Sequence, residues 1–461
     1  MKRIMSRSLI IFVVAIAFFG GLCLLSFRVV TQNEMWAQQP YNGHMASANG
    51  LINAGEITDR NGEILAYTSD KQERVYHSDL NTRTSLLHVV GDDSLNISTA
   101  IQSIYRGNLT GYSFVWGLGL PESMRGSSDV QLTVDANSCK AAYEAFNGKK
   151  GACVVYNYKT GEVLCDVSTP GYDPQNPPEI TQENEEEYEG VYLDNVVSST
   201  YTPGSIFKIV TSVAAIEYID DIYDRTFVCT GEYDIDGKKI TCENAHGYID
   251  HETAFAQSCN IAYAQMAVEV GEERMTEIAT QMGFNKEFQM NGITLAQSKY
   301  SLDSENAYGD NQLAWSGIGQ FEDMANPMHL AIMCGAIANG GKPVAPYLYE
   351  ETSLLSAIGL QGSKDIEQML SADTAVKVQD LMRGAANYYY NVRGLNFGNL
   401  NFCAKTGTAE VGQDKEPNAW IIGYIEDDNH PYAFAVVVEE GGYGISAASP
   451  IAQAAINELI K

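Results

Sequence analysis

The chain has 461 residues, 45% of them hydrophobic, which is ordinary for a globular protein but longer than one compact domain usually is. Its 29 basic and 58 acidic residues give a formal net charge of −29. Because nucleic acids and anionic lipid surfaces are also negative, this charge argues against both as binding partners. We expect one large domain with smaller pieces beside it.

The first thirty residues predict a membrane anchor. Three basic residues lie among the first seven, and the apolar run from Leu9 to Phe27 has one clearly polar residue, Ser26. At about 1.5 Å per residue this run spans roughly 28 Å, enough to cross the hydrocarbon of a bilayer. A cleaved signal peptide would have a shorter apolar run and small residues at its cleavage site, so we favour an uncleaved anchor.

The charges around this run also predict its orientation. Positive residues ahead of a membrane helix stay in the cytoplasm. We therefore expect a cytoplasmic tail over residues 1–7, a transmembrane anchor over 8–27, and the rest of the chain outside the membrane.

The next segment, residues 28–127, is expected to be a linker followed by a small β-rich pedestal. Residues 34–50 are polar and contain glycine, as connecting segments do. The stretch GEITDRNGEILAYT then indicates strand, turn and strand, because Asn61 and Gly62 tolerate the positive φ of a tight hairpin. Short strand-like pieces alternate with turns up to about Gly126. This portion is too small and too rich in loops for an enzyme core.

Residues 128–461 predict one antiparallel sheet covered by helices. The stretch GACVVYNYKTGEVLCDVS alternates apolar and polar residues around a turn at 159–161, and LNFCAKTGTAE, AWIIGYIE and YAFAVVVEE are three later strand candidates. Between these groups lie helical patterns such as SIFKIVTSVAAIEYI, NIAYAQMAVEVG, MHLAIMCGAIANGG and SADTAVKVQDLMRGAAN. Strands at both ends with helices between them favour an α+β fold.

The nine cysteines are too few and too scattered for a disulfide-built scaffold. Two pairs could bridge in an oxidising exterior: Cys229 with Cys242 around a hairpin, and Cys153 with Cys165 on neighbouring strands. Buried free thiols are the equally simple alternative for each pair.

A serine and a lysine three residues apart, Ser205 and Lys208, lie in SIFK at the expected start of a helix, just after Pro203 and Gly204. A serine hydroxyl is a poor nucleophile without a base in reach, and a buried lysine with a lowered pKa can be that base. The helix N-terminus offers amide hydrogens where an oxyanion would form. This spacing also arises by chance about once in a chain this long, with the serine as a helix cap and the lysine as a surface charge.

Two more short motifs change that balance. The tripeptide SCN at 258–260 lies where one helical pattern meets the next, so its serine and asparagine can point into one cleft. The tripeptide KTG at 405–407 lies on a strand, which puts Lys405 and Gly407 on one face, where a side chain on Gly407 would block a substrate lying along the strand. The three motifs follow the order and rough spacing seen in serine β-lactamases and penicillin-binding proteins.

With these motifs the chain resembles the class B penicillin-binding proteins, and its compact N-terminal part makes it similar to those of the penicillin-binding protein A type. Further blocks that resemble the family are GEITDRNGEILA, SGIGQ, NPMHLA, AIANGG and AWIIGY. The chain departs from the family at Ala54 and Val196, where arginine is common, and has Cys259 in the variable centre of the second motif. The resemblance implies a five-stranded antiparallel sheet covered by helices, plus a helical subdomain.

The resemblance also implies roles for the motif residues. Ser205 would attack the carbonyl between the two terminal D-alanines of a peptidoglycan stem peptide, and Lys208 would accept its proton. Ser258 would relay that proton to the departing D-alanine. Asn260 would hold Lys208 and the substrate's backbone amide.

The third motif is implied to bind the substrate. Lys405, Thr406, Gly407 and Thr408 would hold the terminal carboxylate, because a fixed cation and two hydroxyl donors suit that group. The backbone amides of Ser205 and Thr408 would form the oxyanion hole.

The activity implied is a serine-type peptidoglycan D,D-transpeptidase that β-lactams acylate at Ser205, with no cofactor. It would be anchored in a bacterial plasma membrane beside a SEDS-type glycosyltransferase. The alternatives are a D,D-carboxypeptidase, a β-lactamase, and a scaffold or sensor without catalysis.

We read His246 as a loop residue and Trp420 as a core residue or part of the cleft wall. No closely spaced His, Cys and carboxylate cluster is evident, so no metal is predicted.

Overall fold

The computed structural model describes residues 2–37, 46–47, 50–51, 54–111, 129–302, 308–350, 366–412 and 415–461. Much of the expected linker and the end of the expected pedestal lie outside the described residues. The division at 127 and 128 therefore stays a prediction.

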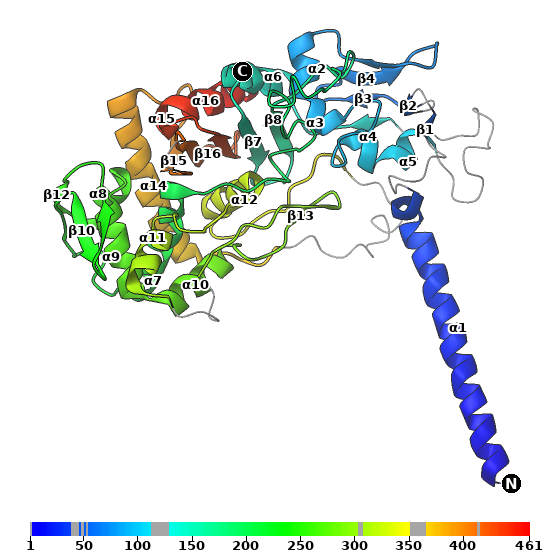
Figure 1. The fold of residues 1–461 in the computed structure, drawn as a ribbon, viewed down its shortest axis with the longest axis horizontal. Helices are drawn as coiled ribbons and strands as arrows, with labels where there is room; N and C mark the ends of the chain where they lie inside the picture. Colours follow the sequence, from blue (N-terminus) through cyan, green and yellow to red (C-terminus); the bar gives the residue numbers. More distant parts are fainter. Residues whose placement is uncertain are drawn as a thin grey trace.

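The predicted anchor is part of one long helix, α1 (Lys2–Ala37), which projects away from the rest of the chain (Figure 1). Its window Ile11–Arg28 has a mean hydropathy of 2.2, and none of that window is buried inside the protein. The helix is thus long and apolar enough to cross a membrane.

The N-terminal part contains a four-stranded sheet in the order β5-β4-β3-β6. The predicted hairpin at Asn61 and Gly62 is confirmed, because β3 and β4 pair antiparallel on either side of it and Gly62 has φ +83°. The Asp59 carboxylate closes the turn by accepting from the Asn61 and Glu63 amides at 2.8 and 2.9 Å. The strands are β3 (Ile57–Thr58), β4 (Ile64–Thr68), β5 (Arg74–Tyr76) and β6 (Val130–Gln131).

Four short helices follow β5: α2 (Leu80–Ser85), α3 (Leu87–Val90), α4 (Ile101–Ile104) and α5 (Arg106–Leu109). The strand β6 pairs parallel with β3 and connects this part to the larger one.

The central sheet has five antiparallel strands in the order β15-β16-β17-β7-β8, as the family resemblance implied. In chain order, the first two strands of this sheet, β7 and β8, form the hairpin predicted around residues 159–161, and the other three come from the C-terminal end. Every residue of β16 and β17 is buried, because helices cover both faces. The strands are β7 (Gly151–Asn157), β8 (Val163–Thr169), β15 (Phe402–Ala409), β16 (Asn418–Ile425) and β17 (Tyr432–Val438).

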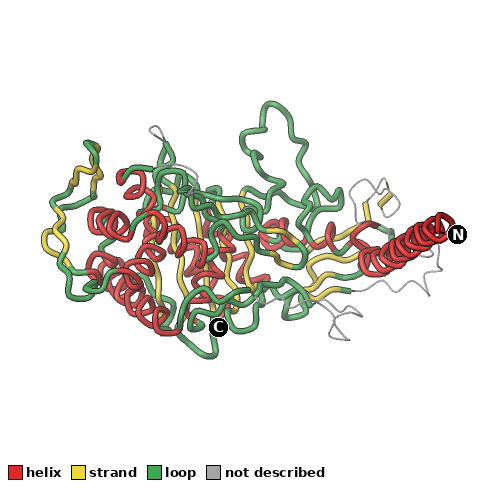
Figure 2. The backbone as a smooth tube through the Cα atoms, turned by 90° about the horizontal axis from the view of Figure 1, so that it is seen from below, coloured by secondary structure: helices red, strands yellow, loops and turns green. Residues whose placement is uncertain are grey.

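Helices α6 (Ala136–Phe146) and α16 (Ser449–Leu459) pack together on one face of this sheet, and α12 (Pro327–Ala338) covers the other (Figures 1 and 2). The long helix α14 (Ala372–Arg393) lies against β15, at one end of the strand order. This arrangement makes β15 the strand of the sheet that lies next to the helical part of the molecule.

The helical part contains α7 (Lys208–Tyr218), α8 (His251–Ala256), α9 (Asn260–Val270), α10 (Glu272–Gln281) and α11 (Asp310–Gly317). All four helical patterns named from the sequence are helices in the structure. Two small two-stranded sheets are inserted between α7 and α8. They pair β9 (Phe227–Cys229) with β12 (Gly247–Ile249), and β10 (Glu232–Ile235) with β11 (Lys238–Thr241).

Candidate active site

Ser205 lies in a 3-10 turn, η3 (Gly204–Phe207), that leads directly into α7. The sequence placed it at the start of an α-helix, and the tighter turn makes the pairing with Lys208 closer. Since a 3-10 helix has 3.0 residues per turn, side chains three apart are eclipsed. Lys208 Nζ lies 3.0 Å from Ser205 Oγ. The lysine side chain is fully buried, whereas the serine is half-buried and lines a cleft.

The second motif meets the same amine. Lys208 Nζ lies 2.7 Å from Asn260 Oδ1, 2.7 Å from the Ser258 carbonyl oxygen and 3.1 Å from Ser258 Oγ. Ser258 has φ +56°, a left-handed conformation that is costly for a serine. Such strain is typical of functional sites. Here it brings both oxygens of Ser258 to the lysine.

Asn260, the first residue of α9, is held by the inserted sheets. Its Nδ2 donates to the Thr241 carbonyl at 2.9 Å, and its backbone N–H donates to Cys242 Sγ at 3.3 Å. With Nδ2 committed in this way, Oδ1 is left facing Lys208.

Lys405 approaches Ser258 from β15. Its Nζ lies 3.1 Å from Ser258 Oγ and donates to the Thr406 carbonyl at 2.9 Å and to Tyr389 Oη at 3.5 Å. The Ser258 hydroxyl therefore lies between two lysine amines. The structure brings together all five groups that the three motifs were predicted to share, namely the side chains of Ser205, Lys208, Ser258, Asn260 and Lys405.

Burial acidifies both lysines. Desolvation and, to a smaller extent, the positive charge of Lys405 lower the pKa of Lys208 to about 7, although Cys242, Cys259 and Glu243 act in the opposite direction. Burial also lowers the pKa of Lys405 to about 7, against a weaker opposing effect of Glu243. Near neutral pH an uncharged Lys208 amine is therefore accessible. It can accept the proton of Ser205.

The structure gives a packing reason for Gly407, beside the substrate clearance that the sequence predicts. A Cβ at this position would lie 3.0 Å from Ile206 Cγ2 and 3.2 Å from both the Pro203 carbonyl and Trp420 Cβ. It would therefore point toward the turn η3 that carries Ser205. Gly204 makes the reciprocal contact, since a Cβ there would lie 2.7 Å from the carbonyl oxygen of Thr408. The two glycines let η3 pack directly on β15.

The motifs open onto a cleft of about 780 Å³. Ser205, Ser258 and Asn260 line it from the helical part, and the half-buried Thr406 and Thr408 line it from β15 together with Gly407. All these residues were predicted site residues.

Residues 151–457 match the family model of the penicillin binding protein transpeptidase domain. The chain belongs to this family.

Relatives of this penicillin-binding protein agree with the match over most of its length. It is 26% identical over 447 residues to the peptidoglycan D,D-transpeptidase PbpA of Mycolicibacterium smegmatis, covering 88% of this chain and 89% of that protein. It is 27% identical over 367 residues to PbpA of Mycobacterium tuberculosis H37Rv, covering 72% of each.

Solved structures of penicillin-binding protein A from M. tuberculosis share the fold. One has a TM-score of 0.73 at 25% identity, covering 89% of this chain and all of that one. An imipenem acyl-enzyme complex of the same protein has a TM-score of 0.73 at 25% identity, covering 88% and 98%.

Sequence reasoning missed part of the cleft of this penicillin-binding protein. Tyr389 on α14 touches both Lys405 Nζ and the Thr406 amide, the latter at 3.4 Å, and it lines the cleft with Trp315 and Tyr443. These aromatics lie outside the short motifs, and a run of three tyrosines on α14 was the sole hint. Trp420 is fully buried, and its indole N–H donates to the Thr202 carbonyl at 3.0 Å. It is a core residue.

No cluster of metal ligands was predicted from the sequence, but the fold forms one. The fold gathers Cys229, Cys242, His246 and Cys259 beside the second motif, with one ligand atom of each within 4.8 Å of the others. All nine cysteines have free thiols in the structure, including both pairs considered as disulfides.

Proposed function

We propose that this penicillin-binding protein is a peptidoglycan D,D-transpeptidase that works through a serine acyl-enzyme. The observation that carries the proposal is the buried amine of Lys208, which contacts Ser205 Oγ, Ser258 Oγ and Asn260 Oδ1 at once. The names of the mycobacterial relatives support it.

Acylation begins at Ser205. Its Oγ attacks the carbonyl carbon of the bond between the two terminal D-alanines, and its proton passes to the neutral Lys208 amine, 3.0 Å away. The resulting oxyanion is held by the backbone N–H groups of Ser205 and Thr408, which belong to the packed elements η3 and β15. When the C–N bond breaks, Ser258 passes the proton from Lys208 to the leaving amine. D-alanine departs and an ester remains on Ser205.

Deacylation reverses the proton path. The amine of a neighbouring stem peptide attacks the ester carbonyl, and its proton returns through Ser258 and Lys208 to Ser205 Oγ. A new peptide bond forms, and this bond is the crosslink.

The substrate would lie along β15, whose outer side is at the end of the strand order, so its backbone can bind an extended peptide. The terminal carboxylate would bind Lys405 and the hydroxyls of Thr406 and Thr408. An anion beside Lys405 favours the charged amine and raises its pKa, so substrate binding would itself keep Lys405 protonated. Penicillin would use the same carboxylate contacts and acylate Ser205.

The helix α1 would anchor the protein with its N-terminus in the cytoplasm and the catalytic part outside. We further propose that α1 and the segment to residue 126 contact a SEDS-type glycosyltransferase. Complex formation that survives a swap of this N-terminal segment would count against that contact.

The decisive assay offers a donor stem peptide ending in D-Ala-D-Ala together with an acceptor amine. A transpeptidase forms the crosslinked product at the expense of hydrolysis, whereas a carboxypeptidase releases D-alanine with water whether or not an acceptor is present. A β-lactamase would release hydrolysed penicillin with many turnovers. A scaffold or sensor would keep its biological activity in the Ser205→Ala variant.

A further inference from the structure

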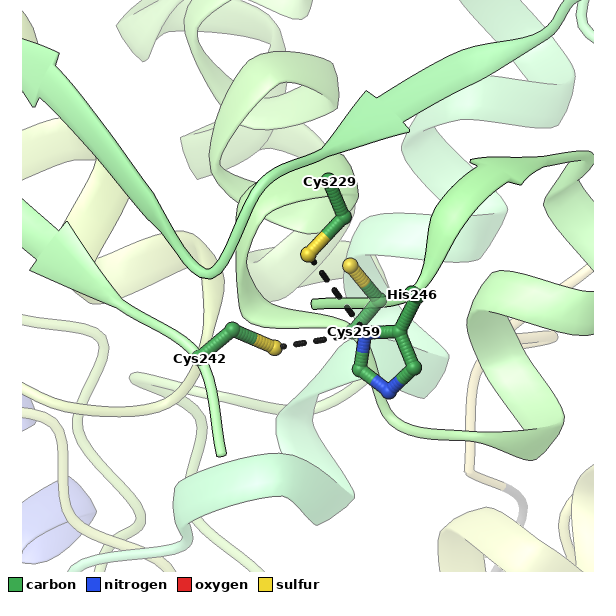
Figure 3. A group of neighbouring side chains, drawn as sticks. All are labelled: Cys229, Cys242, His246 and Cys259. Atoms are coloured by element: carbon green, nitrogen blue, oxygen red, sulfur yellow. Dashed lines mark hydrogen bonds between the residues drawn. The ribbon is translucent and has the colours of Figure 1, made fainter. Parts of the chain in front are cut away.

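Three thiols and one imidazole form a closed cluster beside the active site, which we call the Cys3His cluster (Figure 3). The sulfur atoms of Cys229 and Cys242 lie 3.4 and 3.6 Å from Nδ1 of His246. Cys229 and Cys259 are buried, and the other two members are half-buried. The cluster consists of Cys229, Cys242, His246 and Cys259.

These distances fit a tetrahedral metal site. Zinc bonds of about 2.3 Å to sulfur and about 2.0–2.1 Å to nitrogen place S and N ligand atoms about 3.5–3.6 Å apart across a tetrahedron. The two measured S···N distances, 3.4 and 3.6 Å, agree with that spacing. A disulfide would instead join two of the sulfurs at about 2.05 Å, and the third thiol and the imidazole would take no part in that bond.

Each ligand comes from a different piece of structure. Cys229 ends β9, His246 precedes β12, Cys242 follows β11, and Cys259 is the N-cap of α9. Two-stranded sheets are marginally stable on their own, and both inserted sheets are of this kind. One ion at this point would fasten both sheets to α9.

We propose that the Cys3His cluster binds one structural Zn²⁺ ion. Four protein ligands with S and N donors are the set that closed structural zinc sites use. Such an ion supplies folding energy to a segment that has little core of its own.

The cluster also reaches the catalytic groups. The backbone N–H of Asn260 donates to Cys242 Sγ at 3.3 Å, and its Nδ2 donates to the carbonyl of Thr241 at 2.9 Å. A zinc-bound thiolate goes on accepting an N–H of this kind. Residues 241–246 also form part of the cleft wall. Zinc would therefore fix Asn260 against Lys208, which makes the four ligands positioning residues for acylation.

The test uses the full chain, purified in detergent without chelator. Its zinc content is measured by mass spectrometry, and its thiols are counted after denaturation with a chelator. We expect one zinc per chain and all nine cysteines reactive. Zinc should be lost in Cys229→Ser and kept in Cys334→Ala, a matched control in which another buried cysteine lies in α12.

Several results would overturn the site. One is a purified chain that contains no zinc. Another is a count of seven reactive thiols in place of nine, which would indicate a disulfide. The third is zinc that persists in Cys229→Ser. To separate loss of a ligand from misfolding of that variant, cobalt is also exchanged into the unaltered chain. Strong thiolate-to-cobalt absorption supports the site, and its absence contradicts it.

A second arm tests the coupling to Asn260. Zinc is removed from the unaltered chain, and the rate of acylation by penicillin is measured before and after zinc is restored. We expect at least a tenfold loss that zinc reverses. An unchanged rate would refute the positioning role. The zinc content needs no enzymatic activity, so the metal site can fail or stand separately from the proposed function.

Discussion

At the scale of single residues, one hydroxyl separates two buried amines. Ser258 Oγ lies 3.1 Å from Lys208 Nζ and 3.1 Å from Lys405 Nζ. Two positive charges this close repel, so the neutral form of one amine is favoured. The roles divide naturally, with Lys208 beside the nucleophile as the base and Lys405 on the substrate's strand as the cation.

The first prediction is a pH profile for acylation by penicillin. Only neutral Lys208 can accept the proton of Ser205, and its pKa is lowered to about 7, so the second-order rate constant should rise as pH increases through about 7. Below that point the rate should fall about tenfold per pH unit. At higher pH, loss of the Lys405 charge should reduce carboxylate binding and lower the rate again.

The profile has a matched control in Lys208→Arg. Because a guanidinium stays charged over the whole range, this variant should lose acylation at every pH. A rate that is flat from pH 6 to 9 in the unaltered protein would rule out Lys208 as the base.

At the scale of elements, the site depends on the contact between η3 and β15. The second prediction concerns Gly407→Ala, whose added Cβ would lie 3.0 Å from Ile206 Cγ2. To relieve this contact the nucleophile turn must shift from β15, and a small shift of reacting groups costs about 100-fold in rate. We expect slower acylation with about 1–3 kcal/mol lost in the free energy of unfolding.

The control is Gly384→Ala in α14. A Cβ there meets the far end of the Glu252 side chain, which can move aside. It should acylate at the normal rate. If Gly407→Ala also acylates at the normal rate, direct packing of η3 on β15 is not required for the chemistry. Acylation rates and thermal unfolding measure both variants.

Local patterns predicted the elements because hairpins and helices are decided by neighbouring residues. The Asn61-Gly62 turn and the helix that begins at Lys208 are examples. Contacts between distant segments could be predicted only for the three short motifs, because the family resemblance assigns those motifs to one site. Tyr389 and the Cys3His cluster were missed, because no short-range pattern links a tyrosine on α14 to β15, or four ligands to one point.

At the scale of the whole molecule, α1 stands apart from the body of the protein and its apolar window is exposed (Figure 1). The third prediction is that this helix is retained and holds the protein in the membrane. The intact mass of the purified protein should include residues 1–28, and the protein should leave the membrane fraction only with detergent. A mature chain that begins after Phe27 and is soluble would show a cleaved signal peptide instead.

The net negative charge of the molecule limits the partners that it can bind. With a formal net charge of −29, it is repelled by anionic lipid and nucleic acid, whereas the buried Lys405 lies where the proposed substrate's carboxylate would bind. The buried Lys405 would attract the substrate's carboxylate at short range. Strong salt dependence of penicillin acylation is therefore not expected, since buried charges are screened little.

The central claim is that Ser205 forms the acyl-enzyme, and the most direct measurement is covalent labelling. The full-length protein is incubated with penicillin, digested, and the modified peptide is located by mass spectrometry. We predict one penicilloyl group on Ser205, slow to be released, and none in the Ser205→Ala variant. An unlabelled native protein, or an adduct that persists when Ser205 is replaced by alanine, would contradict the account.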